Sequence, residues 1–207
     1  RSPVLLVLCA AQVALAEAFN LVRGAKLPVI LPGHVILDSS AMDLIRTLAE
    51  RLQIPVASTL LGIGAFPASH DLSLGMMGMH GEAWVNQAIQ EADLLLAFGM
   101  RFDDRVTGNL KTYAQNAKKI HIDIDAAEIN KNVRADVGIV GDLKESLEIL
   151  MPGVKTGDRK KWLDHITELK GDSAVRDIQN LPDDGHLYAA HVINDIWKET
   201  KGEAIVV

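Results

Sequence analysis

The chain has 207 residues, of which 48% are hydrophobic and 23% charged, and its net charge is -6 at pH 7. This composition is typical of one globular domain or of one domain and part of another, and the acidic balance argues against nucleic acid as the main partner. Cys9 is the single cysteine, which excludes an internal disulfide, and no apolar run is long enough for a transmembrane span.

The first segment, RSPVLLVLCAAQVALAEAF, has two interpretations. It resembles a signal peptide, because Arg1 precedes an apolar stretch and then small residues. It also fits an amphipathic helix that runs to about Val22 and packs on a sheet. We favour the helix, because Glu17, Asn20 and Arg23 keep one side polar and the pattern continues past any cleavage point. The chain lacks an initiator Met, so we expect it to be a piece of a longer protein.

Five strand-like runs follow, with helical patterns between them. The runs are Leu27–Leu31, Pro55–Thr59, Asp93–Gly99, Lys119–Asp125 and Val137–Gly141. The helical patterns are Ser39–Gln53, which opens on a serine cap, Gly81–Ala92, and Gly141–Met151, which is capped by Asp142. Short apolar strands that alternate with helices predict a doubly wound, Rossmann-like α/β domain, whose mostly parallel sheet has helices on both faces.

After Met151 the composition changes. The run PGVKTGDRKK predicts a linker, and helices are expected from about Asp158 to Lys170 and over His186–Thr200. The last residues, Glu203–Val207, read as a strand that is cut off at the chain end. A strand without a partner is marginal, so we expect a second α/β domain to begin here. The predicted division is a first domain over residues 1–152, and a linker with helices over 153–207 that leads into a truncated domain.

The ends of the predicted strands carry residues suited to a nucleotide. In open α/β sheets, ligands bind beyond the carboxyl ends of the strands, where glycine admits a ligand and helix amides suit phosphate. The residues at these ends are Gly33, Thr59, Gly62, Gly99, Arg101, Asp123 and Asp142. The alternative is that each glycine only makes a turn. The run GMMGMHG, Gly75–Gly81, is not expected to follow a strand, so it is not the Rossmann fingerprint.

A charged cluster follows the apolar run LLLAFG. Arg101, Asp103, Asp104 and Arg105 could form an ion-pair network that only caps the strand. An arginine at a ligand-binding edge also binds phosphate or carboxylate with two hydrogen bonds. The residues alone leave both interpretations open. No His, Cys, Asp or Glu cluster has metal-ligand spacing, and His121 inside a strand is expected to be structural.

Four motifs in this order resemble a known family. They are PVASTLLGIGAFPASHDLSLGMMGMHG, ADLLLAFGMRFDDRVTGNL, KKIHIDIDAAEINKN and VGDL. They are similar to the central domain of acetolactate synthase (acetohydroxyacid synthase) catalytic subunits, which are thiamine-diphosphate enzymes. The resemblance covers residues from about 20 to 150, and the combination of GMHG, RFDDRVTG and HIDID is highly specific within that superfamily.

The resemblance implies a transferase of three domains, of which this chain holds the central, FAD-binding one. The catalytic glutamate, thiamine diphosphate and magnesium would lie outside it, so no catalytic residue is expected here and the chain alone should be inactive. The family joins two 2-oxo acids, such as pyruvate, with loss of carbon dioxide in branched-chain amino acid biosynthesis. The expected enzyme is a homo-oligomer, dimer or tetramer, and a regulatory subunit is a further candidate partner. The expected compartment is the cytoplasm, or the plastid or mitochondrion in a eukaryote.

The resemblance also implies the site residues. The flavin would be structural and carry no net redox step. Arg105 would help to place the carboxylate of the second 2-oxo acid, and Asp104 would orient Arg105. Where the family has two or three glycines after the first strand, this chain has LPGHV, and His34 could crowd the diphosphate. The implied FAD contacts are Gly33, Thr59, Leu60, Met77, Gly78, Met79, His80, Gly99, Met100, Arg101, Phe102 and Asp103, with Asp123, Ile124, Asp142 and Leu143 at the adenosine end.

Two other functions fit the same residues. One is the nucleotide-binding central domain of another thiamine-diphosphate carboligase or decarboxylase, such as a glyoxylate carboligase, or an oxalyl-CoA decarboxylase with ADP. The other is a scaffold domain that binds no nucleotide. We expect the chain by itself to bind FAD weakly at best, because the family's flavin also contacts the N-terminal domain.

Overall fold

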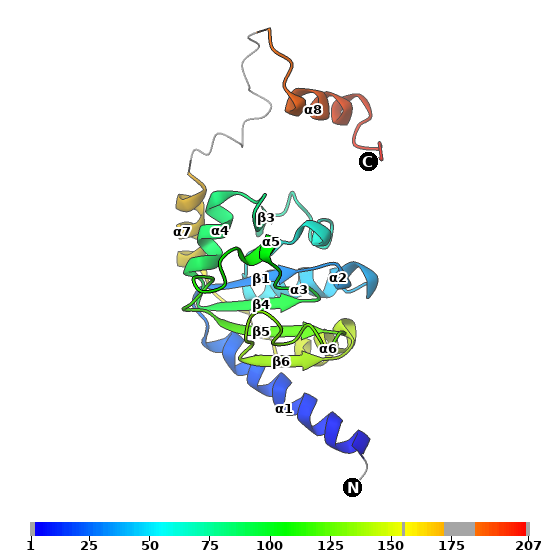
Figure 1. Cartoon of the computed structure of the whole chain (residues 1–207), viewed down its shortest axis with the longest axis vertical. Helices are drawn as coiled ribbons and strands as arrows, with labels where there is room; N and C mark the ends of the chain where they lie inside the picture. The colour runs from blue at the N-terminus through cyan, green and yellow to red at the C-terminus, as the bar shows by residue number, and fades with distance from the viewer. Residues whose placement is uncertain (1–2, 155, 172–184, 206–207) are drawn as a thin grey trace. The chain divides into compact units, whose positions relative to one another are not determined.

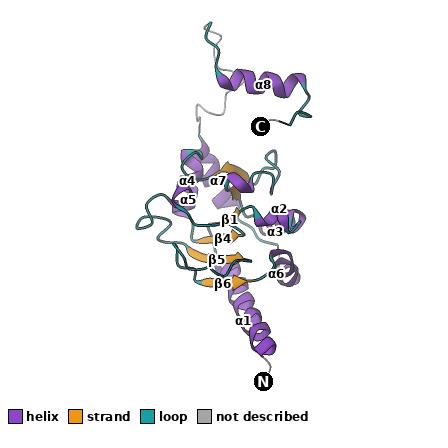
Figure 2. Ribbon diagram, turned by 45° about the vertical axis from the view of Figure 1, so that its right-hand side comes forward, coloured by secondary structure: helices purple, strands orange, loops and turns teal. Residues whose placement is uncertain are grey.

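The computed structural model describes residues 3–154, 156–171 and 185–205, without the side chains of residues 3–12. The chain divides into two compact units, Arg1–Leu169 and Lys170–Val207. Figures 1 and 2 show that the first unit holds the whole sheet, and that the described part of the second holds the helix α8 (Ala189–Glu199).

In the described residues, six parallel strands form one sheet in the order β3-β2-β1-β4-β5-β6. The chain runs outward from β1 to β3, returns to the centre at β4, and runs outward again to β6. The strand order therefore reverses between β1 and β4, and the predicted doubly wound α/β fold is confirmed. The strands are β1 (Pro28–Pro32), β2 (Val56–Ser58), β3 (Ser73–Met76), β4 (Leu94–Phe98), β5 (Lys118–Asp123) and β6 (Val137–Val140).

Helices cover both faces of the sheet. Buried residues of α1, α3 and α6 share one hydrophobic cluster with the sheet, and residues of α4 and α7 share a second one. The helix α1 packs on β6 and α6, as expected for the amphipathic interpretation. The helices of the first unit are α1 (Pro3–Gly24), α2 (Val35–Asp38), α3 (Met42–Leu52), α4 (Ala83–Glu91), α5 (Asp104–Thr107), α6 (Leu143–Leu150) and α7 (Lys160–Lys170), with short 3-10 turns η1 (Leu60–Gly62) and η2 (Met151–Gly153).

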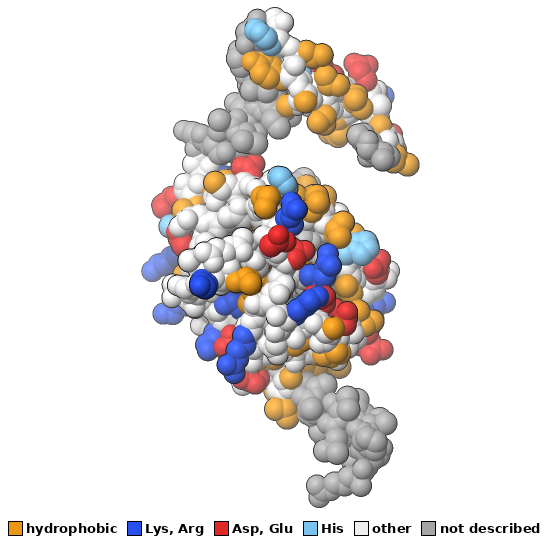
Figure 3. All heavy atoms as spheres, viewed as in Figure 1, with side chains coloured by type: hydrophobic (Ala, Val, Ile, Leu, Met, Phe, Trp, Pro, Cys, Tyr) orange, Lys and Arg blue, Asp and Glu red, His pale blue; other side chains and the backbone are white. Residues whose placement is uncertain are grey.

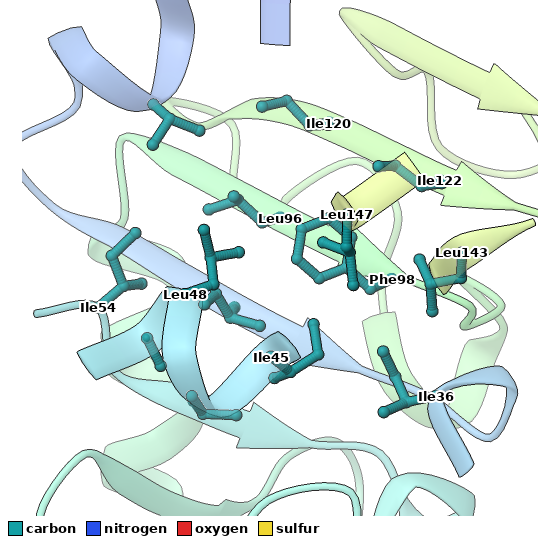
Figure 4. Packing of buried hydrophobic residues seen from close by; sticks show 14 of the residues in the cluster. Ile36, Ile45, Leu48, Ile54, Leu96, Phe98, Ile120, Ile122, Leu143 and Leu147 are labelled. Carbon is teal, nitrogen blue, oxygen red and sulfur yellow. The ribbon is translucent and has the colours of Figure 1, made fainter. Parts of the chain in front are cut away.

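The strand β4 shows why the apolar runs in the sequence are continuous. All five of its residues are buried. Leu96 and Phe98 face the α3 and α6 side, where Figure 4 shows them beside Ile45 and Leu48, while Leu95 belongs to the opposite cluster. A parallel sheet covered on both faces needs apolar side chains at every position, and each fully buried leucine contributes about 1.5–3 kcal/mol.

Three local predictions differ from the structure. The serine cap is wrong, because α3 begins at Met42 and Ser39 ends α2, where its hydroxyl donates to the Val35 carbonyl at 2.7 Å. The strand β3 was not expected. The run GMMGMHG begins inside this strand, which ends at Met76. No strand is present over residues 203–205, and residues 206–207 lie outside the described part. The cap of α6 is confirmed, because Asp142 Oδ1 accepts from the Glu145 amide at 2.9 Å.

The helix α7 belongs to the first unit. The Trp162 side chain is 2% exposed, and its Nε1 donates to the Pro28 carbonyl at 3.0 Å. The Arg159 guanidinium donates to the carbonyls of Leu52 and Val22. The compact unit therefore extends past residue 152, into the segment expected to lead out of the domain. No helix among the described residues has the length and hydropathy that crossing a lipid bilayer requires.

Candidate functional site

The site begins where β1 and β4 end side by side. The Gly33 amide donates to the Phe98 carbonyl at 2.9 Å. A Cβ atom on Gly33 would lie 2.2 Å from the Gly99 carbonyl oxygen and 2.6 Å from the Met100 Cα. Gly99 itself has a φ of +60°, which favours glycine. The two strand ends therefore meet through bare backbone, at the point where the strand order reverses.

Thr59 continues this edge after β2. Its amide donates to the Pro32 carbonyl at 3.2 Å, and its hydroxyl accepts from the Gly62 amide at 3.0 Å. These bonds hold η1 against the end of β1. They also occupy the Thr59 hydroxyl as a cap, while the Leu60 side chain next to it is 66% exposed. Thr59 thus supports the edge, and Leu60 is free to meet a ligand or another domain.

The other end of the edge brings two carboxylates together. The Gly141 amide donates to the Asp123 carbonyl at 3.0 Å, which places Asp142 beside the end of β5. Asp123 is 4% exposed, and its Oδ1 accepts from the Asp125 amide at 2.9 Å. Each carboxylate uses one oxygen in a local turn or cap. The Leu143 side chain is fully buried, so only its backbone could contact a ligand.

Several predicted contact residues point into the core. Met77, Met100 and Phe102 are at most 4% exposed and belong to the cluster on the α4 and α7 face. They can meet a ligand only through their backbone. Met79 and Ile124 are each 60% exposed, and His80 is exposed. Met77 therefore fills the core, as methionine commonly does, and Met79 does not.

The charged cluster forms two separate ion pairs. Arg101 lies 3.7 Å from Asp103, and Arg105 Nε lies 3.9 Å from Asp104 Oδ2. The arginine side chains are 62% and 69% exposed, so these pairs contribute little to stability. Asp103 Oδ1 accepts from the Val106 amide at 3.2 Å and caps α5. Arg105 therefore sits on a one-turn helix.

Two side chains that the sequence analysis did not assign to the site form hydrogen bonds to the backbone of residues 100–102. His121 Nε2 lies 2.9 Å from the Met100 carbonyl, and Asn132 Nδ2 donates to the Phe102 carbonyl at 2.9 Å. Because a carbonyl only accepts, the proton of the His121 ring is on Nε2. Burial lowers the pKa of His121, which keeps the ring neutral. In the sequence, the signal for this role of His121 is a histidine inside the apolar strand KIHIDID.

The surface beside this edge is partly apolar. Large exposed hydrophobic side chains follow the carboxyl ends of β2, β3 and β5: Leu60, Leu61, Ile63, Met79 and Ile124. On the face seen in Figure 3, hydrophobic side chains lie among acidic and basic ones. The His34 ring lies 3.4 Å from the Leu61 carbonyl and 3.3 Å from Asp38. In the described part of the chain, no three His, Cys, Asp or Glu side chains gather as a metal site.

A parallel sheet in this strand order, with glycines meeting where the order reverses, is the arrangement of doubly wound nucleotide-binding domains. The sequence comparison narrows this class. Residues 15–150, more than half of the chain, match the thiamine pyrophosphate enzyme central domain, and the chain belongs to this family.

Curated relatives carry related names. The chain is 48% identical over 157 residues to the "Probable acetolactate synthase large subunit" of Methanocaldococcus jannaschii, covering 74% of this chain and 27% of that protein. It is 42% identical over 194 residues to the "Acetolactate synthase large subunit" of Corynebacterium glutamicum, covering 91% and 31%. It is 40% identical over 205 residues to "Acetolactate synthase 1, chloroplastic" of Nicotiana tabacum, covering 94% and 29%. The chain therefore spans less than a third of the length of these three relatives.

Proposed function

We propose that this chain is the central domain of an acetolactate synthase large subunit, and that it binds FAD along the carboxyl edge of its sheet. The observation that carries the FAD site is the reversal of strand order between β1 and β4, where Gly33 and Gly99 bring the two strand ends into close contact. The names and identities of the relatives support the assignment to the enzyme. Catalysis would need the complete enzyme, because thiamine diphosphate and magnesium would bind outside this chain.

The residues at the edge fit the parts of FAD. The backbone at Gly33 and Gly99 suits the diphosphate, and the carboxylates of Asp123 and Asp142 suit the polar groups of the adenosine end. The exposed side chains of Leu60, Leu61, Ile63, Met79 and Ile124 offer apolar contact to a flat ring. The bound flavin would serve as a structural group without net redox chemistry.

The 2-oxo acid would meet Arg105. Its guanidinium is exposed on α5, and a guanidinium binds a carboxylate through two parallel hydrogen bonds. Asp104 Oδ2, at 3.9 Å from Arg105 Nε, would favour one orientation of that side chain. The proposed roles are therefore divided, with Arg101 and Asp103 on the flavin side and Asp104 and Arg105 on the substrate side.

The second unit suggests how the chain continues into the rest of the enzyme. Its helix α8 has an exposed apolar side, and an amphipathic helix needs a partner for that side. We infer that the C-terminal, thiamine-diphosphate-binding part of the enzyme covers it. Residues 1–152 would be the central domain, and residues 153–207, whose helix α7 still packs on that domain, would be the connection. The complete enzyme would be a homo-oligomer in the cytoplasm, or in a plastid or mitochondrion. The exposed apolar residues of α8 are Val192, Ile193, Ile196 and Trp197, and Leu187 lies just before the helix.

Calorimetric titration of the chain with FAD and with ADP tests the ligand. Weak FAD binding that exceeds ADP binding is the expected result, and it should strengthen in the complete enzyme. A preference for ADP would instead indicate a decarboxylase of the oxalyl-CoA type, and no binding in the complete enzyme would indicate a scaffold. Gly141→Leu tests the location, because FAD binding should weaken in this variant if the ligand lies along this edge, and a Cβ at Gly141 would have only Ser146 Oγ nearby, at 3.8 Å.

A further inference from the structure

Asn86 on α4 holds Gly78 by both of its backbone polar groups. The Gly78 amide donates to Asn86 Oδ1 at 2.9 Å, and Asn86 Nδ2 donates to the Gly78 carbonyl at 2.9 Å. Gly78 is buried and has a φ of +93°, a conformation that side chains disfavour. A side-chain amide that pairs with both groups of one residue fixes the position and the orientation of that peptide. The segment after β3 is therefore anchored to α4 at Gly78.

Gly78 in turn contacts the backbone of Arg105. A Cβ atom on Gly78 would lie 2.5 Å from the Arg105 carbonyl oxygen and 3.3 Å from the Val106 Cα. The next amide along, that of Met79, donates to the same Arg105 carbonyl at 2.8 Å. Asn86 thus holds Gly78, and Met79, the next residue, binds the backbone carbonyl of Arg105.

On this side, α5 borders a cleft. The cleft has a volume of about 260 Å³ and lies between α4, residues 78–79 and α5; Asn86, Asp104, Thr107 and Tyr113 are among its lining residues. The Arg105 side chain is exposed, and its ion pair with Asp104 is 3.9 Å long. Neither feature can fix the place of the guanidinium. The backbone contact with Gly78 and Met79 is the rigid connection on this side.

We propose that Asn86 is a positioning residue for Arg105, acting through Gly78 and Met79 without touching the substrate itself. This inference rests on the proposed function, in which Arg105 binds the carboxylate of the second 2-oxo acid. A bidentate contact tolerates little displacement, because both hydrogen bonds lengthen when the guanidinium moves. Loss of the Asn86 contacts therefore displaces Arg105 and weakens binding of the second substrate. Because Gly78 and Met79 are also proposed flavin contacts, the effect on the substrate is measured at saturating FAD.

Amide hydrogen exchange on this chain tests the structural half. Asn86→Ala removes both bonds to Gly78, while alanine preserves the helix propensity of α4. The matched control is Gln87→Ala, which removes a 2.6 Å bond to Glu91 on the exposed side of the same helix. We expect the Met79 amide to exchange about tenfold faster in Asn86→Ala, the effect of losing one to two hydrogen bonds, and to be unchanged in Gln87→Ala. Unchanged Met79 exchange in Asn86→Ala would overturn the inference.

Kinetics of the complete enzyme test the functional half. In Asn86→Ala, the KM for the second 2-oxo acid should rise about tenfold at saturating FAD, whereas Gln87→Ala should match the wild type. Arg105→Lys is measured in parallel. If Arg105→Lys raises this KM and Asn86→Ala does not, the inference about Asn86 is wrong and the proposed role of Arg105 stands. If neither variant changes the KM, the role of Arg105 fails and the inference fails with it.

Discussion

Gly33→Ala probes the contact on which the proposed nucleotide site depends. The added Cβ would lie 2.2 Å from the Gly99 carbonyl oxygen, whereas ordinary contact begins at 3.4 Å. The nearest opposing atoms are backbone of Gly99 and Met100, which directly follow β4, a central strand that pairs with β1 over its whole length, so they cannot rotate away as a side chain would. Overpacking of a core typically costs 1–3 kcal/mol, and a rigid partner shifts this range upward. We expect a loss of about 3 kcal/mol or more in the free energy of unfolding.

Gly141→Ala is the control at the same edge. Its Cβ would have only Ser146 Oγ nearby, at 3.8 Å, so the free energy of unfolding should stay within about 1 kcal/mol of the wild type. Urea denaturation followed by far-UV circular dichroism measures both variants, and equal slopes ensure that the midpoints report stability. If Gly33→Ala is as stable as Gly141→Ala, then β1 and β4 do not end in close backbone contact, and the geometric argument for the site fails.

Three further predictions concern single residues. Asp123→Ala in the complete enzyme should lower FAD affinity about ten- to hundredfold, the effect of one hydrogen bond to a charged group, and an unchanged Kd in equilibrium dialysis would contradict this. Arg105→Lys keeps the charge but loses the two-pronged contact, so it should raise the KM for the second 2-oxo acid at constant flavin content, whereas Arg101→Lys should lower flavin per subunit first. The reverse pattern would refute the division of the cluster. His165 Nε2 lies 2.6 Å from Glu91 Oε2, and this hydrogen bond raises the pKa of His165. The stability that it adds is therefore complete below the unfolded pKa of about 6.5 and is lost as pH rises through the higher folded pKa. Unfolding curves of the wild type and His165→Asn across this range should converge at high pH, and a constant difference would disprove the link.

The sequence predicted the fold because its signals are local. Runs such as LLLAF at Leu94–Phe98 are apolar at every position, and strands and helices alternate along the chain. The sequence did not predict the strand β3, because this strand has four residues, lies at the edge of the sheet, and contains Gly75 with a φ of +88°. Short strands with an internal glycine lack the periodicity and the β-branched residues on which recognition depends.

The sequence predicted that the strand-end residues lie at one edge of the sheet, but it did not predict the side chains that support this edge. Strand-end residues such as Gly33, Gly99 and Asp123 do lie at one edge, because parallel strands end together. The side chains that hold the edge act at a distance in sequence: His121 bonds to residue 100, and Asn132 bonds to residue 102. Such contacts depend on which strands become neighbours and on loop geometry, and neither is written in local patterns. Asn86 was hidden for the same reason, although Gly78 is only eight residues away.

The attachment of α7 has a consequence for synthesis on the ribosome. The Pro28 carbonyl, at the start of the central strand β1, accepts its hydrogen bond from Trp162, which is synthesised 134 residues later. At about 5–20 residues per second, the interval is roughly 7 to 27 s. Until α7 emerges, the α4 side of the sheet lacks the two large side chains, Trp162 and Ile166, that complete its cover. A nascent chain halted near residue 152 therefore has all strands of the described sheet but one open face, which is the state in which chaperones and neighbouring chains would bind it.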